Sequence, residues 1–256
     1  MKESTRTLLI LALLFVCFFL PPITEVPVSQ EETMLVMRDV FIQTSAAYLW
    51  LSPVIHIFTV LLLVAACLYG SKISRIIDAY FGFLILFMAV SNHVATTENY
   101  GLVIVAGNLV PIFIVGLFWM LEVFKPKNEY VFRRLPVWRY WVVPLVVLAF
   151  WSPIGPDLSP DLNPVLLLTS SFGVMYCPTT PFIVALLTLI YPRVNVFLLG
   201  VTSFVGLFIG IFNVMSYFLM PGYTLWNLIL HVPLMTISAY GLALANIVRD
   251  RHAASI

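Results

Sequence analysis

The chain has 256 residues, of which 61% are hydrophobic and only 10% carry a charge. A soluble domain carries roughly 25% charged residues, and the mean hydropathy of +1.03 agrees that most of this chain has lipid as its solvent. The formal net charge is only +1, and the sequence contains neither a basic patch interleaved with aromatic residues nor a Gly-rich phosphate loop. We therefore expect membrane lipid and no nucleic acid among its partners.

Eight apolar segments are candidates for membrane-spanning helices, because a helix that crosses about 30 Å of hydrocarbon needs about 20 mostly apolar residues. The polar segments between them are too short for a second domain. Residues 1–256 are thus predicted to form one all-α transmembrane domain, a polytopic integral membrane bundle. The predicted spans are 7–23, 46–69, 76–96, 101–124, 140–155, 164–191, 194–219 and 224–248.

The first predicted span leaves the number of membrane spans open between eight and seven. Span 7–23 follows a basic start, as a secretory signal would, but no small-x-small cleavage site follows it. We favour an uncleaved anchor; a cleaved signal would leave seven spans. Segment 24–45 is expected on the extracytoplasmic side, as a linker or as a lid lying in the interface. Ser29 and Glu32 have the spacing of a capping box there.

The lysines and arginines orient the predicted spans, because cytoplasmic loops carry an excess of both. With both termini inside, all of the 13 lysines and arginines except Arg38 fall on the cytoplasmic side. We therefore predict a multi-pass cell-membrane protein with a cytoplasmic C-terminus. Two carboxylates, Asp78 and Glu122, lie at the inner ends of their spans. Their expected partners are Lys72, Arg75 and Lys125.

Polar side chains gather in the outer half of the predicted bundle. Ionisable groups in hydrocarbon are costly, by about 2.5–3.5 kcal/mol on insertion scales for Asp, Lys or Arg, so they are functional candidates by default. An outward-facing polar cavity is predicted from this depth, although single contacts between helices are the alternative for each residue. The predicted lining is His56, Asn108, Asn213 and His231, with His93 and Glu98 at the rim.

The sixth predicted span contains two prolines three residues apart, Pro178 and Pro181. Each proline removes a backbone donor and clashes with the preceding turn, so a break is predicted there. Freed carbonyls at membrane depth must face protein or water, and Thr179 and Thr180 supply hydroxyls beside them. Discontinuous helices of this kind form binding sites in many transporters. The alternative is a proline kink packed inside the bundle.

Cys177 and Pro178 together resemble the Cys-Pro motif in the membrane helices of soft-metal-pumping ATPases. That resemblance implies a thiolate ligand at Cys177, and Met175 would add a thioether of similar softness. No phosphorylation domain or nucleotide site accompanies the motif. The stretch Cys177-Pro-Thr-Thr and the apolar helix after it also resemble segments of uncharacterised multi-pass membrane proteins, which implies no activity.

Three functions are compatible with these features. We expect a small transporter or channel-like permease for a solute or ion, with coupling to proton uptake at His56 or His231. An intramembrane enzyme or redox subunit is the second, with a haem held between the same two histidines; an enzymatic role is the less favoured. The third is an accessory subunit of a membrane complex. Gly206 and Gly210 form a small-xxx-small pair suited to internal packing or to a homo-oligomer.

Overall fold

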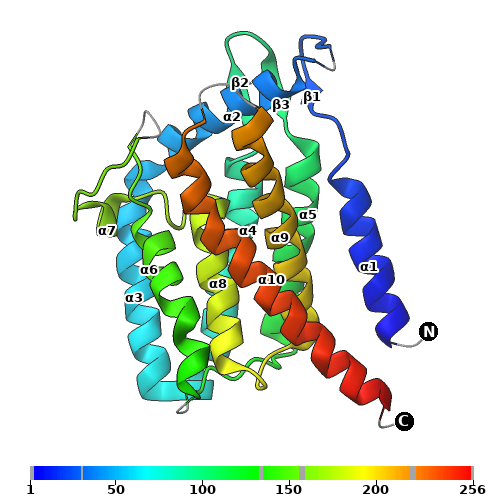
Figure 1. Ribbon diagram of the computed structural model, residues 1–256, viewed down its shortest axis with the longest axis vertical. Coiled ribbons are helices and arrows are strands. Elements are labelled where there is room, and N and C mark those ends of the chain that lie inside the picture. The colour runs from blue at the N-terminus through cyan, green and yellow to red at the C-terminus, as the bar shows by residue number, and fades with distance from the viewer. Residues whose placement is uncertain (1–2, 30, 133–134, 156–158, 220–222, 255–256) are drawn as a thin grey trace.

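The computed structural model describes residues 3–29, 31–132, 135–155, 159–219 and 223–254 (Figure 1). The chain is 73% helical and forms a bundle with a small sheet at one end. We call that end the sheet end and the opposite one, toward which both termini lie, the termini end. The helices are α1 (Glu3–Cys17), α2 (Thr33–Ala47), α3 (Ser52–Tyr69), α4 (Ser74–Ser91), α5 (Ala106–Phe124), α6 (Val142–Trp151), α7 (Leu166–Thr169), α8 (Tyr176–Ile190), α9 (Val196–Leu219) and α10 (Leu225–Ala254).

Four helical segments of the described chain are long and apolar enough to cross a membrane. They are Thr33–Ser91, which joins α2, α3 and α4 through short 3-10 turns, then Ala106–Phe124, Val196–Leu219 and Leu225–Asn246. Shorter apolar helices cover Thr5–Cys17, Val137–Trp151 and Tyr176–Ile190. The first, fifth and sixth predicted spans are thus shorter than predicted, so full-length helices do not account for all eight.

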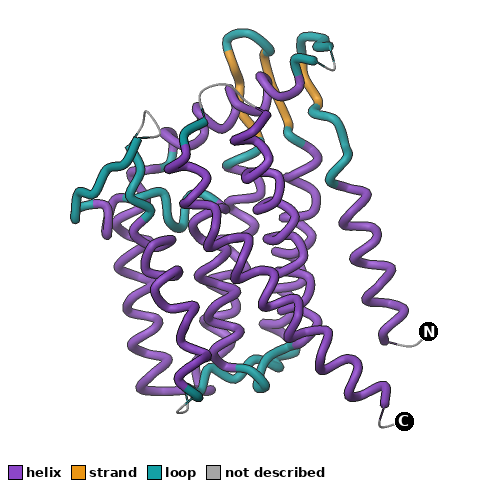
Figure 2. The backbone as a smooth tube through the Cα atoms, viewed as in Figure 1, coloured by secondary structure: helices purple, strands orange, loops and turns teal. Residues whose placement is uncertain are grey.

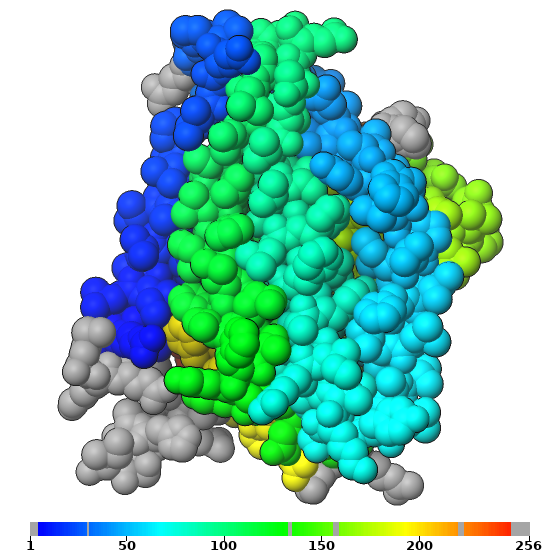
Figure 3. Space-filling model, turned by 180° about the vertical axis from the view of Figure 1, so that it is seen from behind, coloured from blue at the N-terminus to red at the C-terminus, as the bar shows by residue number. Residues whose placement is uncertain are grey.

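Large apolar side chains cover the outside of the bundle. Leu68 is 71% exposed, and Phe83 on α4 is 64% exposed. Figure 3 shows the face that α3, α4 and α5 cover together, with α1 lying along α5. Soluble proteins rarely expose contiguous apolar surface on this scale, so the exposed side chains are those expected of a protein in lipid.

The core lies around α8, of whose residues all but Cys177, Pro178 and Leu189 are buried. α9 packs against α10 on one side of it, and α4 packs against α5 on another. α1 is a member of the bundle, because Leu14 and Phe18 are buried in the main core cluster. The Phe18 ring lies 4.3 Å from that of Phe208 on α9, centroid to centroid.

A three-stranded antiparallel sheet at the sheet end corrects the all-α prediction. Its strands are β1 (Ile23–Thr24), β2 (Val94–Thr97) and β3 (Gly101–Ile104), in the order β1-β3-β2 (Figure 2). Two of them, β2 and β3, fall at the ends of the predicted spans 76–96 and 101–124. β-Branched residues favour strands, and the hydroxyl of Thr97 accepts the Tyr100 N–H to stabilise the turn between β2 and β3.

Helix α2 packs across this sheet and accounts for most of segment 24–45. Val36 and Val40 on α2 form a second core cluster with Val103 and Val105. The Glu32 carboxylate accepts hydrogen bonds from the backbone and the hydroxyl of Ser29, both at 2.8 Å. The capping-box spacing thus makes a contact one turn ahead of the helix, which begins at Thr33.

The sixth predicted span is interrupted earlier than its prolines suggested. α7 ends at Thr169, residues 170–175 are non-helical, and α8 begins at Tyr176. Pro178 is the third residue of α8, where its N–H would have no helical partner in any case. Pro181 lies inside the continuous helix. The prediction that the break falls at Pro178 and Pro181 is therefore wrong in position; we call residues 170–175 the interruption.

Candidate functional site

The interruption is built around Gly173, which adopts a φ of +79°. A Cβ atom at this position would collide with Cγ2 of Ile55 on α3. Both the left-handed backbone and the close approach of α3 therefore require glycine. The preceding residue, Phe172, is fully buried, so the interruption lies inside the protein and not against lipid.

Side chains from two helices satisfy the backbone of the interruption. Asn92, at the end of α4, donates from Nδ2 to the carbonyl of Val174 at 2.8 Å and accepts the N–H of Tyr176 at 3.1 Å. The Thr179 hydroxyl accepts the N–H of Gly173 at 2.7 Å and donates to the carbonyl of Met175 at 2.6 Å. Buried backbone groups need such partners, so these two residues hold the break open.

His56 on α3 lies beside the same interruption and is fully buried. Its Nδ1 lies 2.8 Å from the carbonyl of Ser52, and its Nε2 lies 3.2 Å from the hydroxyl of Ser170. The rings of Phe150 and Phe172 pack on it at 4.6 and 5.2 Å between centroids. The Ser52 hydroxyl donates to the carbonyl of Ser170. His56 therefore ties α3 to the interruption.

The other predicted lining residues are only partly brought together. Asn213 on α9 approaches Cys177 on α8, with 3.7 Å between Nδ2 and Sγ. The Nδ1 atom of His231 lies 2.7 Å from the carbonyl of Asn227 on its own helix. Asn108 lies in the first turn of α5 and is partly buried. Thr180 is buried and lies against Gly206 of α9.

The predicted rim residues differ from each other in exposure. Glu98 is exposed in the turn between β2 and β3. His93 is buried, and its Nδ1 contacts the carbonyl of Ala89 at 3.0 Å. Burial lowers the pKa of His93 from an ordinary value of 6.5 to about 4. His93 is therefore a neutral packing residue and not an open rim.

Two hollows of the described surface lie away from the predicted lining residues. One is bordered by β1 and β3 around Glu25 and Leu102. The other lies between the end of α2, α4 and α5, around Tyr48 and Phe87. No hydrogen bond or ring contact in the described part of the chain joins His56 to His231. The outer polar residues thus form separate contacts. The Cys177–Asn213 pair lies at the first turn of α8, directly after the interruption.

A second polar cluster lies at the termini end, where sequence reasoning expected simple ion pairs. Asp78 on α4 and Glu122 on α5 are 0% and 3% exposed. Oδ1 of Asp78 accepts from Asn128 Nδ2 at 2.9 Å and from the Tyr130 hydroxyl at 2.8 Å. Glu122 accepts from the backbone of Lys127 and Asn128, and from Asn195 Nδ2 at 2.6 Å.

These partners correct the expected pairing of both carboxylates. Among the described residues, no lysine or arginine side chain forms an ion pair with Asp78 or Glu122. Asn128 joins the two carboxylates, because its Nδ2 donates to Asp78 and its backbone N–H donates to Glu122. Its Oδ1 also accepts the N–H of Asn195 at 2.8 Å. The residues that complete the cluster come from loops without an apolar period, so no helical pattern could have identified them. We call these five residues, Asp78, Glu122, Asn128, Tyr130 and Asn195, the acid cluster.

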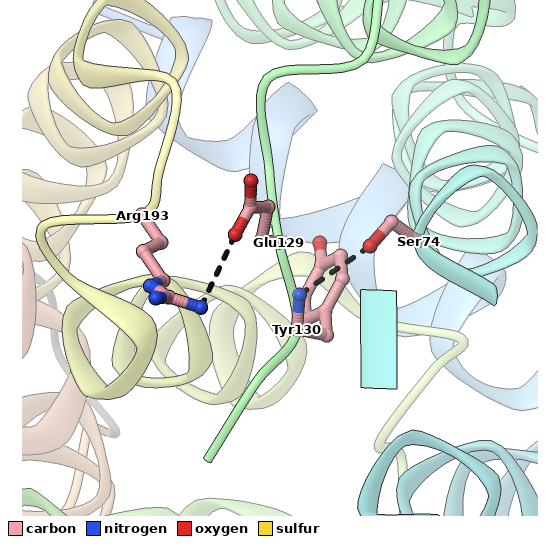
Figure 4. Close-up of polar contacts among 4 residues, drawn as sticks. All are labelled: Ser74, Glu129, Tyr130 and Arg193. Carbon is pink, nitrogen blue, oxygen red and sulfur yellow. Dashed lines mark hydrogen bonds and ion pairs between the residues drawn. The ribbon is translucent and has the colours of Figure 1, made fainter. Parts of the chain in front are cut away.

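The loop that carries Asn128 is fixed on both sides at the rim of the acid cluster (Figure 4). The N–H of Tyr130 approaches the Ser74 hydroxyl at 3.3 Å, and Arg193 forms an ion pair with Glu129 at 3.3 Å. The N–H of Glu129 also donates to the carbonyl of Arg193 at 2.9 Å. Burial, followed by the charge of Asp78, holds the pKa of Tyr130 well above its ordinary value. Its hydroxyl therefore stays a donor.

No protein-family model, curated protein or solved structure matches the chain. The arrangement of the residues is therefore the evidence for function. It does not fit a haem held between His56 and His231, because Nε2 of His56 is directed at Ser170 and the carbonyl of Phe150. Within the described residues, no group of three or more His, Cys, Asp or Glu side chains could hold a metal ion. Cys177 lies beside Asn213, with 3.7 Å between Sγ and Nδ2, and the carbonyl of Met175 accepts the Thr179 hydroxyl.

Proposed function

We propose that the protein is a small membrane transporter or permease whose solute path passes the interruption at the start of α8. The observation that supports this is non-helical backbone buried in an apolar bundle and held by Asn92 and Thr179. Irregular backbone at membrane depth is tolerated only where it is buried in protein or lines a water-filled path. Broken helices at this depth are a recurrent way to build solute and ion sites.

The proposed site lies where the first turn of α8 faces α9. Cys177 Sγ and the Asn213 amide contribute a soft ligand and a donor, and the Thr179 hydroxyl lies one turn from the interruption. Pro181 has no N–H, so the carbonyl of Cys177 lacks its helical donor. A carbonyl, a thiol and an amide together suit a small polar solute or a monovalent ion, including a soft metal ion as cargo.

We further propose eight crossings, with the termini end in the cytoplasm. α1, α3, α4, α5, α6, the α7–α8 pair, α9 and α10 would each cross once. An even number of crossings places both termini on one side, and both lie toward the same end of the bundle (Figure 1). Lys72, Lys127 and Arg193 belong to connections at that end, in agreement with the excess of basic residues in cytoplasmic loops.

The experiment uses the full-length protein in detergent and in liposomes. A ligand that binds only the folded state raises its melting temperature, so a thermal-shift screen over monovalent and soft metal cations, inorganic anions and small polar solutes identifies a candidate. Flux of that candidate is then measured in liposomes. We expect uptake that Cys177→Ala or Thr179→Val reduces at least tenfold.

Cys67→Ala is the matched control, because Cys67 is an exposed thiol on α3 away from the interruption. Its uptake should equal that of the unmodified protein. A protein that shows neither a thermal shift nor flux with any member of the panel would contradict the proposal. An accessory subunit, the remaining alternative, would instead co-purify with a fixed partner at constant stoichiometry.

A further inference from the structure

The acid cluster holds two carboxylates that share neutral donors. Five donors reach them, namely two side-chain amides, one phenol and two backbone N–H groups. None of these carries a positive charge. A buried charge without a counter-charge is strongly destabilising, so two ionised carboxylates at 0% and 3% exposure would need compensation that these donors do not supply.

The donors leave one carboxylate oxygen open. Both oxygens of Glu122 and Oδ1 of Asp78 accept hydrogen bonds, whereas Oδ2 of Asp78 is buried without a partner. An unpartnered charged oxygen in an interior is rare, since buried polar groups are satisfied in folded proteins. The positive charge that balances the cluster must therefore bind at Oδ2.

We propose that the acid cluster is a proton-binding site, in which Oδ2 of Asp78 takes up one exchangeable proton. A proton needs one oxygen, and one is open. A metal ion such as Ca²⁺ needs six to eight oxygen ligands, and the remaining oxygens already accept hydrogen bonds. In the event that the protein is a transporter, as proposed above, the inference names the proton as its coupling ion and places it on Asp78, away from His56 and His231.

The surroundings of Asp78 allow this proton to be exchanged at the termini end. Among the titratable groups, Glu122 faces Asp78 from α5, and Tyr130 faces it from the loop after α5. Lys72 and Arg75, which precede Asp78 in the sequence, are exposed. On α8, the titratable residues Tyr176 and Cys177 are at the opposite end of the helix. The Glu129–Arg193 pair lies at the rim of the cluster, and its side chains are 54% and 35% exposed. On release to water, the proton leaves Oδ2 as a hydronium ion and Asp78 becomes a carboxylate.

Infrared difference spectroscopy of the full-length protein in liposomes tests the proton directly, without a transport assay. A protonated carboxyl has a C=O stretch that an ionised carboxylate lacks. We expect such a band in the unmodified protein, with reversible loss as pH rises. Asp78→Asn should abolish it, and Glu122→Gln should keep it but shift its midpoint to lower pH, because a neighbouring negative charge is removed. Asp39→Asn, at the sheet end, is the matched control and should leave the band unchanged.

Tyr130→Phe provides a second test should Asp78→Asn fail to fold. It removes one donor from Oδ1 of Asp78 and keeps the ring, so the frequency of the band should shift. A band that is absent at every pH, or one that Asp78→Asn and Tyr130→Phe both leave unchanged, would overturn the inference. The result is separate from the proposed function, because a protein without flux still shows the band when the site is correct.

Discussion

Asn92 donates its side-chain amide to the carbonyl oxygen of Val174 at 2.8 Å, across the boundary between α4 and the interruption. The same side chain accepts the N–H of Tyr176 at 3.1 Å. One asparagine thus pairs with a carbonyl and an N–H that the interruption leaves without helical partners. Because Asn92 is only 2% exposed, water cannot substitute for either bond.

Replacement of Asn92 should therefore destabilise the fold. Asn92→Ala leaves a buried carbonyl and a buried N–H unpaired, each of which costs about 1–3 kcal/mol. We expect a clearly lower melting temperature in detergent micelles. Asn99→Ala is the control, because Asn99 is exposed in the β2–β3 turn and its contact with Asp39 is long, at 3.3 Å. Equal melting temperatures for the two variants would show that Asn92 does not hold the interruption.

The glycines of α9 differ in how closely α10 approaches them. A Cβ at Gly206 would lie 2.5 Å from the Ser238 hydroxyl, whereas at Gly200 it would lie 3.4 Å from Ala245. Gly206→Ala should therefore lower the melting temperature, and Gly200→Ala should leave it nearly unchanged, since overpacking costs about 1–3 kcal/mol.

The packing of the α9 glycines against α10 also bears on the homo-oligomer that the sequence suggested. Gly206 and Gly210 face Ser238 and Met235 of α10 in the same chain, so the surface proposed for a second copy is already occupied. We expect neither variant to change the oligomeric state, which size-exclusion chromatography with light scattering measures. A shift from oligomer to monomer in Gly206→Ala alone would restore the oligomer interpretation.

His93 predicts a loss of stability in acid. Burial lowers the pKa of His93 to about 4 in the folded protein, whereas in the unfolded chain it titrates near its ordinary value. The unfolded state then binds more protons between these values, so stability is full above pH 6.5 and falls as pH drops toward 4, by on the order of 3 kcal/mol. His93→Gln should flatten this dependence in thermal unfolding measured at several pH values. An unchanged slope in the variant would assign the acid sensitivity to another group.

The apolar helices could be predicted because hydropathy and length determine them. The predicted spans agree within a few residues with most ends of four helices, namely α3, α5, α9 and the start of α10. The burial of His56, Asp78 and Glu122 also follows, in that polar groups within apolar segments must find partners. The candidate residues at the start of α8 were identified because prolines and hydroxyls stand out in an apolar run.

The partners of those residues could not be predicted from one sequence. Asn128 and Asn195 belong to loops, and only the folded bundle brings them to Glu122. Local rules placed the break at the prolines, but Pro178 falls in the first turn of α8, where proline is tolerated. The determinants of the true break, Gly173 against Ile55 and the Asn92 amide, are contacts between helices. The prediction of one outer cavity assumed that residues at equal depth also face one another.

Cysteine labelling tests the proposed orientation. In a background without native cysteines, Lys127→Cys places an exposed thiol at the termini end, and Glu98→Cys places one at the sheet end. Because the termini end carries the basic loops, an impermeant thiol reagent should label residue 98 in intact cells and residue 127 only after permeabilisation. Asn128, although in the same loop, is only 2% exposed and would not report accessibility. The opposite labelling pattern would reverse the orientation.

The two prolines of α8 should prove dispensable for the interruption itself. Pro178 lies where no helical donor is needed, and an alanine at 181 would restore a single hydrogen bond to the carbonyl of Cys177, worth about 1 kcal/mol. Neither change alters the left-handed backbone at Gly173 or the Asn92 contacts. Hydrogen–deuterium exchange followed by mass spectrometry should therefore show the same exchange over residues 170–175 in Pro178→Ala/Pro181→Ala as in the unmodified protein. Gly173→Ala is the contrasting variant, because its Cβ would collide with Ile55, and it should speed exchange there. Slower exchange in the double alanine variant would mean that the helix had become continuous, and that the prolines, not the contacts from α3 and α4, keep it open.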